Sequence, residues 1–148
     1  MRPISRTRGK NRTRGQTLVE FALILPIFVL VLVGIFDFGR AVYAYNTISN
    51  ASREAVRIGI VDQNVGVLEA EAVKASVALG AVPGDVDVAF LTNDLSGTCA
   101  VPISIGCVVE ITVHYRYNAA TPIVSNLVGT IDMTSTTRQV VERSYVSP

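Results

Sequence analysis

The N-terminal part of the chain carries the pattern of one long helix. Residues 18–36 hold a single charged side chain, Glu20, and these 19 residues would span roughly 28 Å as a helix, close to the hydrocarbon thickness of a bilayer. Pro26 lies inside this run, and membrane helices tolerate such a proline with a kink. The helical pattern continues without another proline, so we expect one helix over about residues 17–61.

The part of this helix beyond the apolar run has a stripe of small and apolar residues at alternating steps of three and four positions. The stripe consists of Phe38, Ala41, Tyr45, Ile48, Ser52, Ala55 and Gly59. Its small members would let another backbone approach closely, so we expect the stripe to be buried on a sheet or on a neighbouring subunit. Tyr43 and Tyr45 are expected to anchor the helix at the membrane interface.

The rest of the chain predicts one short helix followed by strands. The spacing of apolar residues over 67–79 is that of an amphipathic helix. Three stretches alternate as strands do, namely residues 85–90, 108–117 and 131–141. A loop over 92–104 and a connection over 118–129 join them. The prediction is an α+β fold, in which a long N-terminal transmembrane helix extends out of the membrane and packs on an antiparallel sheet of three or four strands.

Charge is distributed asymmetrically along the chain. Six basic residues precede the first acid: Arg2, Arg6, Arg8, Lys10, Arg12 and Arg14. From Gln16 onward there are seven basic and twelve acidic residues, a balance of −5. A basic tail directly before an apolar run favours a cytoplasmic N-terminus, and no aromatic residue stands among the arginines to stack on nucleic-acid bases. We therefore expect no nucleic-acid partner.

These patterns divide the chain into three parts. Residues 1–15 would be a disordered basic leader in the cytoplasm. Residues 16–61 would form the long helix, transmembrane over about 18–36, and residues 62–148 an extracytoplasmic α+β domain. The resulting protein would be a single-pass protein of the cytoplasmic membrane, in contact with membrane lipid.

The chain has two cysteines, Cys99 and Cys107, and both would lie outside the cytoplasm. A disulfide can persist there, and closing this short loop would stabilise the fold by about 2.5 kcal/mol in the chain-entropy model. Two free buried thiols are the alternative.

No set of residues in the sequence has the spacing of a catalytic or metal site. His114 is the only histidine, so a zinc site lacks ligands, and we expect this side chain to be exposed on a strand. Glu110 and Asp132 could form a carboxylate pair, but nothing in the sequence fixes their separation. We therefore predict a protein that is not an enzyme and has no cofactor.

The junction of tail and helix resembles a known family. Five segments carry the resemblance: Gly15-Gln16-Thr17-Leu18-Val19-Glu20-Phe21-Ala22-Leu23, Leu25-Pro26, Gly34-Ile35-Phe36, Phe38-Gly39-Arg40 and Arg53-Glu54-Ala55. Together they resemble the TadE-like proteins, which are pseudopilins or minor pilins of the tight-adherence (Tad or Flp-type) pilus. The resemblance covers roughly residues 14–60 and implies a pilin-like fold.

The resemblance also implies a mechanism. In that family, as in type IV pilins, a membrane prepilin peptidase cuts after the glycine, which here is the Gly15–Gln16 bond. Glu20 would become the fifth residue of the mature chain and pair with the N-terminal amine of a neighbouring subunit. The implied partners are other pilins or pseudopilins, the prepilin peptidase and the membrane platform that assembles the pilus. Because major Flp pilins are very short, the folded C-terminal part favours a minor subunit.

Two other interpretations remain open at the level of the sequence. The first is a membrane-anchored extracytoplasmic binding domain unrelated to pili, which would tolerate Glu20→Ala. The second is a secreted protein with a removable signal peptide, for which a cleavage site is poor until Val42-Tyr43-Ala44.

Overall fold

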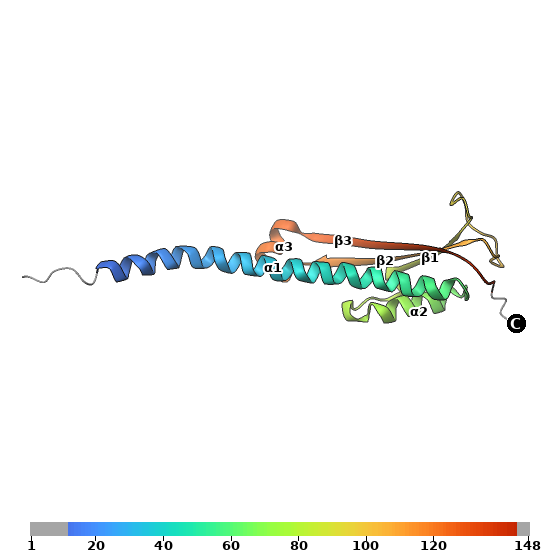
Figure 1. Cartoon of the computed structure of the whole chain (residues 1–148), viewed down its shortest axis with the longest axis horizontal. Coiled ribbons are helices and arrows are strands. Elements are labelled where there is room, and N and C mark those ends of the chain that lie inside the picture. The colour runs from blue at the N-terminus through green and yellow to red at the C-terminus, as the bar shows by residue number, and fades with distance from the viewer. Residues whose placement is uncertain (1–11, 145–148) are drawn as a thin grey trace, which may run out of the picture.

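The computed structural model describes residues 12–144 and is built around a helix of 48 residues, α1 (Arg12–Gly59) (Figure 1). The N-terminal half of α1 extends away from the rest of the protein, and the apolar side chains of residues 18–36 lie mostly exposed along it. The C-terminal half lies against a sheet and a second helix. Among the described residues, α1 is the helix long and apolar enough to cross a membrane.

The start of α1 differs from the prediction. Residues 1–11 of the predicted disordered leader lie outside the described part of the chain. The prediction is wrong for residues 12–15, which are helical. Arg12 and Arg14 have good helix propensity, although Thr13 and Gly15 do not. Extending an existing helix is far easier than nucleating one, so the apolar helix continues upstream. The division into leader, long helix and outer domain remains a prediction.

Between residues 60 and 144 the chain forms helices and strands in the predicted order. They are α2 (Val65–Ala75), the short 3₁₀ helices η1 (Val77–Leu79) and η2 (Pro83–Asp85), β1 (Val86–Leu91), β2 (Val108–Asn118), α3 (Pro122–Val128) and β3 (Thr130–Val140). The predicted single helix over 67–79 is divided at Ser76. The Ser76 hydroxyl donates a hydrogen bond to the carbonyl oxygen of Ala72 at 2.6 Å, at the C-terminal end of α2.

The three strands form an antiparallel sheet in the order β1–β2–β3. Ile111 in the middle of β2 pairs with Val88 on β1 and with Thr137 on β3. α1 packs on β2 and β3, α2 packs on β1 and on α1, and both helices lie on the same side of the sheet (Figure 1). The alternate residues of β2 that face the helices form the centre of the core: Val109, Ile111, Val113 and Tyr117. The predicted α+β fold is confirmed.

The buried face of α1 is only partly the predicted stripe. Ile48, Ser52, Ala55 and Gly59 are buried as expected, but Phe38 and Tyr45 are exposed. Their places on the buried face are taken by Asp37 and Ala44, one position earlier in the sequence. Alanine lets the sheet approach the helix, whereas a tyrosine ring would hold it away. The prediction followed apolar size, while the packing follows close approach and, at Asp37, hydrogen bonding.

Small residues bring the end of α1 very close to β2 and β3. A Cβ added to Gly59 would lie 2.9 Å from Val109 Cγ2 and 3.4 Å from Leu68 Cδ1, closer than real contacts allow in the first case. Two turns earlier in α1, the buried Ser52 hydroxyl lies 2.8 Å from Thr137 Oγ1 and 3.3 Å from Ser135 Oγ, both on β3. The helix and the sheet are therefore joined both by contact and by a small polar cluster.

Candidate assembly site along the N-terminal helix

The predicted processing site lies at the start of α1. Gly15 and Gln16 are helical and exposed, and a Cβ added to Gly15 would meet no atom within 4 Å. No described atom of the protein outside α1 therefore lies against Gly15. Cleavage itself remains a prediction.

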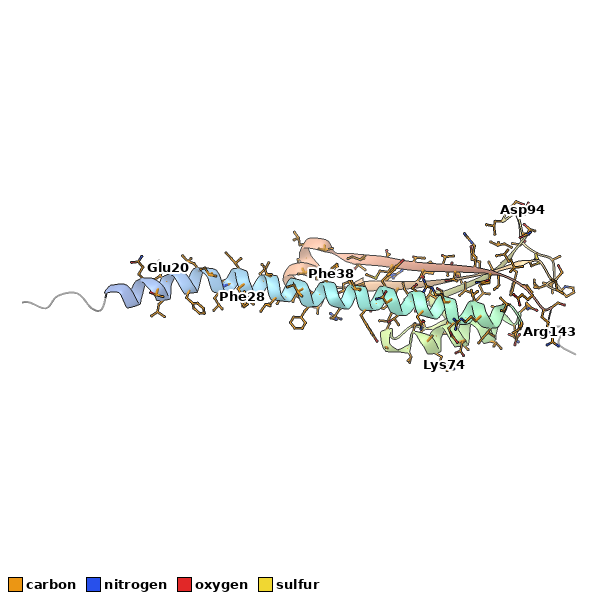
Figure 2. The ribbon with its side chains drawn as sticks, viewed as in Figure 1. Glu20, Phe28, Phe38, Lys74, Asp94 and Arg143 are labelled. Carbon is orange, nitrogen blue, oxygen red and sulfur yellow. A yellow bond between two sulfur atoms is a disulfide. The ribbon has the colours of Figure 1, made fainter. Side chains whose placement is uncertain are left out.

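Glu20 lies one helical turn beyond Gln16, on the same face. Gln16 Nε2 donates a hydrogen bond to Glu20 Oε1 at 3.3 Å, the spacing of an i, i+4 pair. The adjacent apolar side chains of Leu18, Val19 and Phe21 are exposed. In a bilayer this carboxylate would stand among lipid chains with one long amide hydrogen bond, and such groups usually meet a partner. Figure 2 shows Glu20 near the free end of the helix, far from the folded outer part.

A second acid on α1, Asp37, is buried at the point where the helix meets the sheet. Its residue is 5% exposed, and its carboxylate accepts hydrogen bonds from the Ala120 amide at 3.0 Å and from the Thr121 hydroxyl. The Thr121 amide also points to it, at 3.4 Å. Thr121 is the residue that precedes α3. Asp37 therefore fastens the start of α3 to the long helix, which we call the Asp37 clasp (Asp37, Tyr117, Ala120 and Thr121).

The backbone of α1 takes part in the same cluster. The Tyr117 hydroxyl donates a hydrogen bond to the carbonyl oxygen of Asp37 at 2.7 Å. Arg40 lies with its guanidinium carbon 5.9 Å from the centre of the Tyr117 ring and with Nη1 3.7 Å from Asp37 Oδ1. The cluster thus joins the last residue of β2 that faces the core, the start of α3 and one turn of α1.

Hydrogen bonds and burial shift the pKa values of the two titratable groups in the clasp, Asp37 and Tyr117. The bond from the Thr121 hydroxyl lowers the pKa of Asp37 below its ordinary value, against the opposing effect of burial, and the Ala120 and Thr121 amides and Arg40 lower it further. Burial raises the pKa of Tyr117, and the Asp37 charge adds to that. The carboxylate therefore stays ionised and the phenol stays protonated, as their hydrogen bonds require.

The sequence alone hardly predicts the Asp37 clasp. Asp37 and Arg40 stand at helical spacing, but the residues that hold the carboxylate lie 83 and 84 positions away. The one usable signal is a charged residue at the end of an apolar run, next to a stripe that must be buried.

The far end of the protein holds the disulfide. Cys99 and Cys107, for which the sequence favours a disulfide, are bonded, with their Cα atoms 6.3 Å apart. They close the loop between β1 and β2, which lies at the opposite end of the sheet from α3 (Figure 1). The disulfide is therefore remote from Gly15, Glu20 and the Asp37 clasp.

The outer face of the sheet carries separate polar pairs rather than a joint site. Glu110 pairs with Arg138, and Asp132 pairs with Arg116 at 3.8 Å, so the two acids considered as a carboxylate pair each bind an arginine on the neighbouring strand. His114 is exposed, as predicted, and its Nε2 lies 2.9 Å from an Asp87 carboxylate oxygen.

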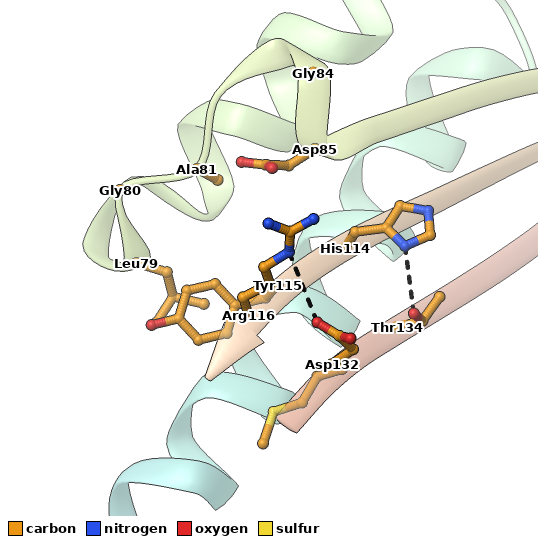
Figure 3. Close-up of a pocket in the computed structure, with 11 residues that line it drawn as sticks. Leu79, Gly80, Ala81, Gly84, Asp85, His114, Tyr115, Arg116, Asp132 and Thr134 are labelled. Atoms are coloured by element: carbon orange, nitrogen blue, oxygen red, sulfur yellow. Dashed lines mark hydrogen bonds and ion pairs between the residues drawn. The ribbon is translucent and has the colours of Figure 1, made fainter. Parts of the chain in front are cut away.

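A surface pocket of about 650 Å³ lies beside these pairs, between β2, β3 and the loop from Leu79 to Asp85 (Figure 3). The side chains with polar groups that line it are those of Asp85, His114, Tyr115, Arg116, Asp132 and Thr134. Thr134 Oγ1 lies 3.3 Å from His114 Nδ1. Within residues 12–144 no group of three or more histidine, cysteine or acidic residues could hold a metal ion.

Comparison with known proteins finds one family model that matches the N-terminal helix. Residues 15–57 match the family described as TadE-like protein. Over these residues the chain is similar to the TadE-like proteins. The resemblance seen in the sequence is thereby confirmed. No curated protein and no solved structure matches the chain. The TadE-like family is a structural family associated with pili rather than a family of enzymes.

The TadE-like match coincides with one structural element. It begins at Gly15, close to the start of α1, and ends two residues before the last residue of that helix. The match includes the exposed apolar half of α1, with Glu20, and the half that packs on the sheet, with Asp37. Everything from α2 onward lies outside the match. The family match therefore supports conclusions about the helix only, and the outer domain must be interpreted from its own structure.

Proposed function

We propose that this TadE-like chain is a minor pilin or pseudopilin, a structural component in the assembly of a tight-adherence pilus. In this proposal α1 crosses the cytoplasmic membrane at about residues 18–36, with its N-terminus in the cytoplasm and the sheet outside. One observation carries the proposal: the family match falls on a helix whose most apolar stretch is not covered by its own protein. Such a helix is available to lipid first and to other pilin helices afterwards.

Cleavage after Gly15 would change the charge of the helix end. The leader holds six basic residues and no acid, so its removal takes away every positive side chain before the span. The new N-terminus is the α-amine of Gln16. A single amine replaces the six charges that hold the uncut chain in the membrane with its tail in the cytoplasm.

The new amine and Glu20 would then be a matched pair on the same helix face. They are four residues apart, which corresponds to an offset of roughly 6 Å along the axis. Two parallel subunits shifted by about that distance could bring the amine of one to the Glu20 carboxylate of the other. Each charge alone is costly in lipid, and pairing offsets much of that cost. The pair would therefore set the register between neighbouring helices.

Cleavage is tested by mass spectrometry of the protein purified from cells that contain the pilus system. The expected mature N-terminus is Gln16, and deletion of the prepilin peptidase should restore the full-length mass. A Gly15→Val variant should remain uncut. A tail that is intact in cells carrying an active peptidase would rule out this processing.

Pairing is tested with Glu20→Gln, which removes the charge and keeps a side chain of the same shape. The variant should be cut after Gly15 but should no longer co-purify with its pilin partners after crosslinking. Glu54→Gln is the matched control, because Glu54 is a partly exposed acid on the other half of α1. If Glu20→Gln recovers partners as well as the control does, Glu20 is not an assembly residue.

A membrane-anchored binding domain is the second candidate. The observation in its favour is the pocket of about 650 Å³, because it belongs to the outer domain and lies outside the family match. Under this alternative Glu20→Gln would leave function intact, while a change at the pocket such as Arg116→Ala would remove it. The same pair of variants therefore separates the two candidates.

A further inference from the structure

The short helix α3 packs beside the long helix at the end of its apolar run. Val124 and Val128 of α3 line an apolar cavity of about 200 Å³ together with Gly34 and Phe38 of α1. Gly34 belongs to the apolar run that we assign to the membrane. The Asp37 clasp fixes the start of α3 at this level. α3 therefore lies beside the last turn of the apolar run and not above it, at the end of the sheet nearest the free half of α1 (Figure 1).

The exposed surface of α3 includes large apolar side chains and no charged one. No charged residue occurs between Arg116 and Asp132, a stretch of 15 residues that includes all of α3. Leu127 is 85% exposed and Val128 is 53% exposed. Phe36 and Phe38, which lie on α1 at the same level, are 73% and 72% exposed. The exposed apolar surface of the helix thus continues onto α3.

We infer that α3 is a second membrane contact, which inserts Leu127 and Val128 into the interface of the outer leaflet. We call this pair the α3 lip (Leu127 and Val128). The inference rests on the proposed membrane anchoring of α1. If residues 18–36 fill the hydrocarbon layer, Gly34 lies only about 3 Å inside its edge, and the elements packed beside Gly34 must lie in the interface. A short amphipathic helix there buries its apolar side chains about 5–10 Å deep.

Lipid is favoured over a second protein by the continuity of the surface. The α3 lip lies next to apolar side chains of α1 that would face lipid in the same anchoring, so one bilayer covers both. The clasp prevents α3 from moving away, because three groups at its start bind Asp37. A protein held at α1 and α3 has a fixed tilt, and the outer domain would stand at one angle to the membrane.

The absence of tryptophan from the chain makes a clean test available. Single tryptophans are placed by Leu127→Trp on the lip, by Phe28→Trp in the span and by Val101→Trp in the disulfide loop at the far end. Val101 is 88% exposed, which matches Leu127. Each full-length variant is reconstituted in phosphatidylcholine vesicles, with and without lipid brominated near the carbonyl end of its chains. Far-UV circular dichroism equal to that of the wild type shows that each variant is folded.

We expect a blue-shifted emission from Leu127→Trp that brominated lipid quenches about twofold, as for an interfacial side chain. Val101→Trp should emit as in water and should not be quenched. If Phe28→Trp is quenched and Leu127→Trp behaves like Val101→Trp, the lip does not touch lipid and the inference fails while the anchoring stands. If Phe28→Trp is also unquenched, the anchoring fails and this inference fails with it.

One further outcome assigns a different occupant. The Leu127→Trp emission could be blue-shifted yet insensitive to brominated lipid, with a shift that grows as the ratio of protein to lipid rises. A second copy of the chain would then cover the lip, and the lipid assignment would be overturned.

Discussion

Gly59 lies where α1 comes closest to β2, and its replacement by alanine sets two effects of similar size against each other. Alanine in a helix is favoured over glycine by roughly 0.5–1 kcal/mol. The added methyl group would lie 2.9 Å and 3.3 Å from the two methyl groups of Val109 and 3.4 Å from Leu68. Val109 is fully buried, and a β-branched side chain has little freedom to turn away.

Overpacking of this kind costs about 1–3 kcal/mol, which exceeds the gain in helix propensity. Gly59→Ala should therefore lower the free energy of unfolding by about 1 kcal/mol. For a domain of this size that loss lowers the melting temperature by roughly 4–8 °C. The measurement is thermal unfolding of the full-length protein in detergent, followed by near-UV circular dichroism of the tyrosines. Gly39→Ala is the matched control, because a Cβ at Gly39 would meet no atom within 4 Å and the site is on the same helix.

A double mutant identifies the cause of the loss. Val109→Ala alone should destabilise the protein by about 2 kcal/mol, since it removes two buried methyl groups and leaves a cavity. In Gly59→Ala/Val109→Ala the new methyl group occupies part of that space, so the double mutant should be at least about 1 kcal/mol more stable than the sum of the single changes predicts. If Gly59→Ala is as stabilising as Gly39→Ala, or if the two changes are additive, the close approach does not limit this site.

Three further predictions concern the Asp37 clasp and the disulfide. Because the pKa of Asp37 is lowered on folding, its ionised carboxylate contributes fully to the free energy of unfolding above the ordinary pKa of 3.8. That contribution is lost as the pH falls through the lowered pKa. Unfolding measured as a function of pH should show this loss in the wild type, and Asp37→Asn should no longer show it. Tyr117→Phe removes one buried hydrogen bond and should cost about 0.5–1.5 kcal/mol in denaturant unfolding, whereas Tyr115→Phe, two residues along the same strand, should cost less. Replacing Cys99 and Cys107 by alanine should cost about 2.5 kcal/mol relative to the oxidised protein, and a reductant should abolish the difference.

The elements of the outer domain follow closely from local patterns. The alternation predicted over residues 108–117 is found along most of β2, because a strand between a helix layer and solvent must alternate whatever it pairs with. The predicted strand 131–141 agrees with β3 to within one residue at each end. Short helices were harder to place. α3 has only seven residues, and neither periodicity nor capping is distinctive over that length.

Some residues of the candidate site could be predicted from the sequence and others could not. Gly15 and Glu20 could be singled out from the sequence, because a glycine after a basic tail and an acid in an apolar run are local features. The Asp37 clasp could not, since its carboxylate is held by groups more than 80 residues away. A charged residue at the end of an apolar run can mark a buried acid, but it does not indicate which distant amides will reach it.

The sequence by itself determined the long apolar helix, its similarity to the TadE-like proteins and the charge asymmetry of its ends, because each depends on residues that are neighbours in the chain. Only the tertiary structure decided which face of α1 is buried and at what level α3 lies. Phe38 is the more apolar residue, yet Asp37 faces the sheet, because the hydrogen bonds from Ala120 and Thr121 to its carboxylate are available only on that side. The choice between the two residues was made by partners that come together only when the chain has folded.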